Sequence, residues 1–305
     1  MTAVTFGNNG ITMAGELNLP AGFDAAKTYP ALVVVHPGGG VKEQTAGLYA
    51  GKLAEEGFVT LAYDASFQGE SGGEPHFLED PAARVADISA AVDYLQSLDY
   101  VDAERIGTWG VCAGGGYAVA ATKVDARIKA VGTVSAVNIG SAWRKGWDGT
   151  GSDADAVPTR DGASAQRTVE ATAGGDAATL PYVPAEVTPE VPRDLAEASE
   201  YYLTPRAQHP NAQNKYLFAQ SIPRILGFDA FALVEDLLTQ PVLIVAGSEA
   251  ASLWHSTELH SRARGEKKLV IVDGAAHMDF YDGEQYVARA VAEAAPFFTE
   301  KLAAA

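Results

Sequence analysis

The stretch at residues 105–122 constrains the fold most, because it joins a short apolar strand, an abrupt turn and a helix of small residues. Cys112, the only cysteine of the chain, stands at the turn, with Gly110 and Gly114 two positions away on either side. A nucleophile held at positive φ on a strand-to-helix turn brings these flanking positions so close that only very small residues fit. The pattern therefore predicts a nucleophile elbow, with a thiol where serine usually stands.

Two other interpretations compete with the elbow. A lone cysteine is often simply a small buried hydrophobe. The glycines also resemble a dinucleotide-binding turn, but the G-x-G-x-x-G spacing is out of register because position 112 is cysteine. The acidic residue that this fingerprint needs about 20 residues later is also missing. We therefore expect no dinucleotide, and the sequence predicts no other cofactor.

Charge and composition exclude several kinds of partner. The formal net charge of −17 argues against nucleic acid and anionic membranes, which both demand a cationic surface. The sequence has no run of about 18 apolar residues and no basic patch followed by an apolar core at its start, so we expect neither a membrane helix nor a signal peptide. A single cysteine cannot form an internal disulfide, which fits a cytoplasmic protein. The six histidines and one cysteine show no metal-ligand spacing, so no metal site is predicted.

Apolar runs that alternate with helical patterns indicate an α/β fold with a mostly parallel sheet flanked by helices. The expected buried strands are residues 29–36, 58–63, 128–135, 240–247 and 267–273. The pattern breaks between 138 and 227, a segment rich in acidic residues, alanine, glycine and proline. We therefore expect residues 1–137 and 228–305 to form one core, and residues 138–227 to form a cap inserted at the carboxyl ends of the strands.

A thiol at the elbow needs a base and a group that stabilises an oxyanion. His277 follows the last expected strand and is the best-placed histidine for the base. The N–H of Ala113, directly after the nucleophile, is one expected oxyanion donor. A second would come from the glycine-rich loop after the strand at 29–36, where Gly39, Gly40 and Val41 are all candidates.

Several motifs together resemble a known family. They are His-Pro-Gly-Gly-Gly-Val-Lys-Glu-Gln-Thr-Ala-Gly at 36–47, Asp-Ala-Ser-Phe-Gln-Gly-Glu-Ser-Gly-Gly at 64–73, Gly-Val-Cys-Ala-Gly-Gly-Gly-Tyr at 110–117, Glu-Tyr-Tyr-Leu-Thr-Pro-Arg at 200–206 and Gly-Ala-Ala-His-Met-Asp-Phe-Tyr-Asp at 274–282. The chain resembles an α/β-hydrolase of the dienelactone hydrolase-like superfamily, and within it the hydrolases labelled YcjY-like or polyketide-transferase-like. The resemblance implies the α/β-hydrolase fold, a Cys112 nucleophile with His277 as base, and hydrolysis or transfer of an acyl group.

The expected acid departs from the pattern of the wider superfamily. Its members place an aspartate in Gly-x-x-Asp after the penultimate strand, whereas this chain has Ala250 at that position. Glu249, one residue earlier, is our candidate for orienting His277, and Asp279 is the alternative. A Cys–His pair also works without a strong third member, because a thiol ionises more readily than a serine hydroxyl.

Other residues have weaker assignments. In dienelactone hydrolases a glutamate from the corresponding loop contacts the resting cysteine, so the resemblance suggests Glu43 for that contact; a solvated glutamate at a helix start is the alternative. Four aromatic residues are expected to line an apolar substrate pocket, although they could equally form the core of the cap: Trp143, Trp147, Tyr201 and Tyr202.

The predicted function is a cysteine-dependent acyl hydrolase that acts on a small-molecule ester, lactone or thioester through an acyl-enzyme. One alternative is an acyltransferase that passes the same acyl group to another acceptor. The other is a non-catalytic ligand-binding protein on a hydrolase scaffold, which the missing aspartate favours. The sequence leaves the substrate and the oligomeric state open, a homo-oligomer included.

Overall fold

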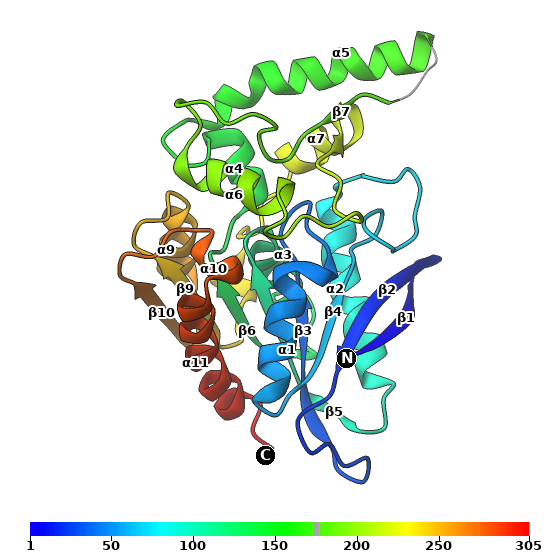
Figure 1. The fold of residues 1–305 in the computed structure, drawn as a ribbon, viewed down its shortest axis with the longest axis vertical. Coiled ribbons are helices and arrows are strands. Elements are labelled where there is room, and N and C mark those ends of the chain that lie inside the picture. The colour runs from blue at the N-terminus through cyan, green and yellow to red at the C-terminus, as the bar shows by residue number, and fades with distance from the viewer. Residues whose placement is uncertain (174–176, 305) are drawn as a thin grey trace.

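The computed structural model describes residues 1–173 and 177–304, and these form an α/β structure built on one mixed sheet (Figure 1). Its eight strands run in the order β1-β2-β4-β3-β5-β6-β9-β10. The strands are β1 (Thr2–Asn8), β2 (Ile11–Asn18), β3 (Tyr29–Val35), β4 (Val59–Tyr63), β5 (Val101–Val111), β6 (Ile128–Val134), β9 (Val242–Gly247) and β10 (Lys267–Val272). All neighbours from β4 to β10 are parallel, and only β1 and β2 join antiparallel. This order and direction confirm the predicted α/β-hydrolase fold.

Helices cover both faces of the sheet. Helices α1 and α11 pack together on one face of the sheet, where α1 contacts β3 and β4 and α11 contacts β6 and β9. Helices α2 and α3 pack together on the opposite face. The helices around the sheet are α1 (Gly47–Glu55), α2 (Pro81–Gln96), α3 (Ala113–Thr122), α8 (Val234–Leu237), α9 (Leu253–Arg262), α10 (Asp279–Asp282) and α11 (Glu284–Lys301). Strand β4, most of β3 and the second half of β5 are buried because this double coverage leaves neither of their faces in water.

The segment from α4 to α7, which follows β6, lies beyond the carboxyl ends of the parallel strands, at the top of Figure 1. Its elements are α4 (Ile139–Lys145), α5 (Val157–Ala173), β7 (Thr179–Leu180), α6 (Arg193–Leu203), β8 (Tyr216–Leu217) and α7 (Phe218–Leu226). Helix α5 is mostly exposed, whereas α6 turns Tyr201 and Tyr202 inward. None of the described helices is both long and apolar enough to cross a membrane.

Candidate active site

Cys112 occupies the turn between β5 and α3 with φ 54° and ψ −125°. A Cβ on Gly110 would lie 2.3 Å from the carbonyl oxygen of Gly114, and one on Gly114 would lie 2.3 Å from that of Val35. Glycine is therefore required at both positions, because any side chain would collide with backbone. The structure places Cys112 on the strained strand-to-helix turn that the spacing predicts.

The thiol of Cys112 is almost buried, with 9% of the residue exposed. Burial raises its pKa to about 11, although hydrogen bonds from the Tyr281 hydroxyl and from the Ala113 N–H to the sulfur oppose that rise. Burial outweighs both bonds because a thiolate loses far more hydration than a thiol does. The free protein therefore holds a protonated thiol at neutral pH.

His277 lies in the loop after β10 and lines the same cavity as Cys112. Its Nδ1 is 2.6 Å from the Ser252 hydroxyl oxygen, and its Nε2 is 3.4 Å from the Tyr281 hydroxyl. Burial lowers the His277 pKa to about 4, with the nearby Asp194 charge opposing the shift. The imidazole is therefore neutral at pH 7 and able to accept a proton.

The Tyr281 hydroxyl lies close to both groups, within reach of the Cys112 sulfur and 3.4 Å from His277 Nε2. Within the described residues, no direct hydrogen bond joins Cys112 to His277. Sequence reasoning missed Tyr281, although a signal was present: it follows His277 by four residues, and such a spacing on a helical turn places two side chains on one face.

The structure does not bring the predicted acid to the histidine. The Glu249 side chain is exposed and forms no hydrogen bond with the described residues, while Asp279 Oδ2 accepts from its own loop at the Ala276 N–H, 2.7 Å away. Ser252, at the start of α9, occupies the position next to Nδ1 instead. The Glu249 side chain points away from the imidazole because its turn directs it outward, with its N–H bound to the carbonyl of Ala275 at 2.9 Å.

Asp194 is a second group that the sequence did not reveal. It is 1% exposed, lines the cavity and belongs to α6, far from His277 in the chain. Its Oδ2 accepts from Trp147 Nε1 at 2.8 Å and from the N–H of Ala251 at 2.9 Å. It therefore connects the 138–227 segment to the loop that carries Ser252.

Two of the predicted oxyanion donors are already engaged. The Gly40 N–H donates to the carbonyl of Pro37 at 3.2 Å, and the Val41 N–H donates to Gln44 Oε1 at 3.2 Å. The Gly39 N–H has no acceptor among the described residues, and neither has that of Gly38, which lines the cavity beside Ala113. The N–H groups of Gly38 and Gly39 are therefore available as donors, and that of Ala113 becomes available when a substrate oxygen replaces the sulfur as its acceptor.

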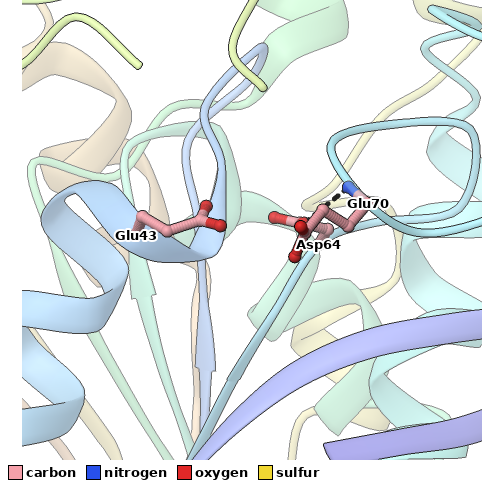
Figure 2. Close-up of side chains that lie close together, drawn as sticks. All are labelled: Glu43, Asp64 and Glu70. Atoms are coloured by element: carbon pink, nitrogen blue, oxygen red, sulfur yellow. Dashed lines mark hydrogen bonds between the residues drawn. The ribbon is translucent and has the colours of Figure 1, made fainter. Parts of the chain in front are cut away.

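Glu43 does not contact the thiol; its carboxylate lies near those of Asp64 and Glu70 (Figure 2), and the three belong to a cluster around Lys42. The Lys42 ammonium donates to Glu43 Oε1 at 2.6 Å, to Asp64 Oδ2 at 2.9 Å and to Glu70 Oε2 at 2.7 Å. These three carboxylates lie close enough to hold a metal ion, but the ammonium sits among them as their counter-charge. Those bonds raise the Lys42 pKa despite its burial.

A cavity of about 320 Å³ opens above Cys112 and His277. Of the predicted aromatic residues, Trp143, Trp147 and Tyr202 line it, whereas Tyr201 packs behind against Tyr202, with ring centroids 4.9 Å apart. Sequence reasoning missed Tyr182 and Tyr216, which also line it. The volume is at the lower end of the usual range for small-molecule sites.

An elbow nucleophile at the carboxyl end of a parallel sheet, with a histidine after the last strand, defines an α/β-hydrolase. The dienelactone hydrolase family model matches residues 18–136. The chain is 51% identical to the uncharacterized protein YcjY of Escherichia coli over 97% of this chain and 96% of that one. The crystal structure of hypothetical protein PA2218 from Pseudomonas aeruginosa superposes with a TM-score of 0.91 at 35% identity, covering 98% of this chain and 93% of that one. The chain belongs to the dienelactone hydrolase family and is a hydrolase of ester-type bonds.

Partial matches connect the chain with two fungal enzymes. Acyltransferase drtE of Aspergillus calidoustus is 40% identical over 37% of each chain. Thiohydrolase aneE of Aspergillus aculeatus is 34% identical over 33% of this chain and 32% of that one. Membership in a hydrolase family favours an enzyme over the non-catalytic alternative.

The raised pKa of Cys112 predicts how the thiol reacts with alkylating agents. Since the thiolate fraction grows tenfold per pH unit until about pH 11, the rate of iodoacetamide alkylation should climb about tenfold per unit from pH 7 to 10. Glutathione, measured alongside, should begin to level off near pH 9, because an unperturbed thiol has a pKa of about 8.5. A rate for the protein that reaches its plateau below pH 8 would show a thiolate already present at rest.

Proposed function

We propose that the protein is a cysteine-dependent acyl hydrolase whose acyl-enzyme forms on Cys112, from an ester, lactone or thioester. The observation that carries the proposal is the meeting, in one cavity, of the elbow thiol of Cys112, the N–H of Ala113 and the neutral imidazole of His277. A nucleophile, a base and an oxyanion donor within one small cavity are the parts that acyl transfer needs.

The reaction begins from a neutral thiol and a neutral imidazole. As Sγ attacks the carbonyl carbon, the thiol gives its proton to the Tyr281 oxygen, and the Tyr281 hydroxyl turns toward His277 and gives its own proton to Nε2. The imidazolium keeps its Nδ1–H on the Ser252 oxygen. The Ala113 N–H and one from Gly38 or Gly39 hold the oxyanion. The intermediate then expels the alcohol or thiol, which takes the proton from Nε2, and the acyl group stays on sulfur.

Water completes the cycle. Nε2 accepts a proton from the water that attacks the thioester carbonyl, the tetrahedral intermediate releases the sulfur, and the free acid leaves as Cys112 regains its proton. Asp194 favours the imidazolium in both halves of the reaction, because its charge raises the His277 pKa. The 138–227 segment acts as the cap that limits water in this cavity, since Trp147, Tyr182 and Tyr202 from that segment line it.

The test looks for the covalent intermediate. Wild type mixed with p-nitrophenyl acetate, or with an acyl thioester, should gain the mass of one acyl group on the tryptic peptide that contains Cys112. Cys112→Ala should gain none and should lose turnover by a factor on the order of 10⁴ or more. Equal turnover in both proteins, or an adduct on another side chain, would remove Cys112 from the mechanism.

The acyltransferase alternative is favoured by the partial match to drtE and uses the same intermediate. It is tested by adding an alcohol or a thiol acceptor to the reaction. If the protein is a hydrolase, the free acid should remain the main product as the acceptor concentration rises to millimolar levels. If the acyl-enzyme instead persists in water and decays only when acceptor is present, the protein is a transferase.

A further inference from the structure

The only formal charge among the described residues that line the cavity is negative. The described residues that line it include no lysine or arginine, and Asp194 is the one carboxylate among them. The remaining walls are mostly apolar, formed by Val137, Ile139, Trp143 and Leu195 among others. Four tyrosines also line the cavity, and the hydroxyls of Tyr182 and Tyr202 have no hydrogen-bond partner among the described residues. A ligand in this cavity therefore meets aliphatic and aromatic surface, neutral hydroxyls and one negative charge.

Among the described residues, no lysine or arginine lines the cavity to compensate the Asp194 charge. Asp194 Oδ2 is satisfied by Trp147 and Ala251, but its Oδ1 accepts no hydrogen bond from the described residues. The adjacent Arg193 is 59% exposed and pairs with Glu197 at 2.7 Å. The neighbouring imidazole of His277 is neutral at pH 7 because burial lowers its pKa to about 4. Asp194 thus presents both a negative potential and a free acceptor to whatever enters.

We infer that the acyl group of the substrate is uncharged and largely apolar, and that Asp194 excludes acyl groups that carry a carboxylate. The inference rests on the proposed function and names the class of substrate for that same site. A carboxylate entering this cavity would lose its hydration, find no cationic partner and face a like charge. The polar group that fits is a hydroxyl or amide N–H donating to Asp194 Oδ1.

The size of the effect follows from the electrostatics. Two like charges about 6 Å apart at an effective dielectric constant near 20 repel enough to change a binding constant on the order of a hundredfold. Desolvation of the incoming carboxylate adds to the discrimination. Removing the Asp194 charge should therefore recover about a hundredfold for an anionic substrate relative to a neutral one of the same shape.

The experiment compares two esters of matched shape. Mono-p-nitrophenyl glutarate ends in a carboxylate, and p-nitrophenyl 5-oxohexanoate replaces one carboxylate oxygen with a methyl group. After subtraction of uncatalysed hydrolysis, wild type should show a kcat/KM for the neutral ester at least about a hundredfold above that for the anionic one. Asp194→Asn should shrink this ratio about a hundredfold. The ratio is used because any general loss through His277 affects both esters and cancels.

Two control variants separate charge from structural disturbance. Asp161→Asn makes the same change on the exposed face of α5 and should leave the ratio unchanged. Trp147→Phe removes one hydrogen bond to Asp194 but keeps its charge, and should also retain the discrimination. Thermal melting of each variant checks that it is folded.

The outcomes distinguish this inference from the function on which it rests. Equal kcat/KM for the two esters in wild type, or an unchanged ratio in Asp194→Asn, would overturn the inference while leaving the acyl-enzyme intact. If wild type turns over neither ester and Cys112 gains no acyl group, the proposed function itself fails.

Discussion

Replacing His277 with alanine should lower kcat/KM for a neutral p-nitrophenyl ester by about 10²–10⁴, with little change in the stability of the fold. The loss should be large because the thiol and the imidazole are both neutral at rest, so every turnover needs a base to take the thiol proton. A resting ion pair would have made the thiolate available beforehand. The measurement is steady-state kinetics at pH 7, with mass spectrometry to follow acylation of Cys112.

Two variants of residues that contact His277 test how much each contact contributes to the rate. Tyr281→Phe should cost less, on the order of tenfold to a hundredfold, because the base remains while the hydroxyl between sulfur and Nε2 is lost. Ser252→Ala should cost a similar amount by freeing the imidazole to rotate. Added imidazole should partly restore His277→Ala and should not restore Tyr281→Phe. A His277→Ala protein with wild-type acylation rates would mean that another group takes the proton.

Gly114→Ala should destabilise the protein by about 3 kcal/mol or more and abolish the elbow geometry. The added Cβ would lie 2.3 Å from the carbonyl oxygen of Val35 and 2.6 Å from that of His36. Both atoms belong to backbone of β3 and its following loop, so neither can move without shifting the oxyanion donors. The loss of stability is measured by urea unfolding, and the loss of the site by the failure to acylate Cys112.

A matched glycine provides the control. Gly51 lies within α1, and a Cβ there would have nothing within 4 Å. Gly51→Ala should leave the free energy of unfolding unchanged or increase it by up to about 1 kcal/mol, because alanine favours the helix. Equal midpoints for Gly114→Ala and wild type would show that the loop around the elbow adapts, contrary to the close packing of the structure.

The sequence could predict the elbow and the fold because both depend on local patterns. Gly110 and Gly114 are spaced as the turn requires, and the apolar runs are long enough to be buried strands. His277 was predictable as a candidate because it follows the last strand, where the loop must reach the carboxyl edge of the sheet. Each of these inferences needs only neighbouring residues and the direction of the chain.

The partners of His277 depend on contacts between distant segments. Glu249 and Ser252 lie three positions apart in one loop, and only the direction of the turn decides which side chain points at the imidazole. Asp194 reaches the cavity from an insertion whose path no periodicity in the sequence reveals. The contact between Glu43 and the thiol that the resemblance suggested is absent for a related reason. The loop that carries Glu43 directs its carboxylate toward Lys42 rather than toward the sulfur.

The cluster around Lys42 has a consequence for the timing of catalysis. Lys42 directly follows the glycine loop, and its backbone N–H and ammonium both bind Asp64 at the end of β4. On the other side of that loop, the Arg84 guanidinium donates to the carbonyl of His36 at 2.7 Å. Hydrogen bonds to Asp64 and from Arg84 thus hold the glycine loop at both ends in the free protein. A carbonyl entering the cavity meets a rigid receptor, and the chain needs no rearrangement of its own at the moment when negative charge develops on oxygen.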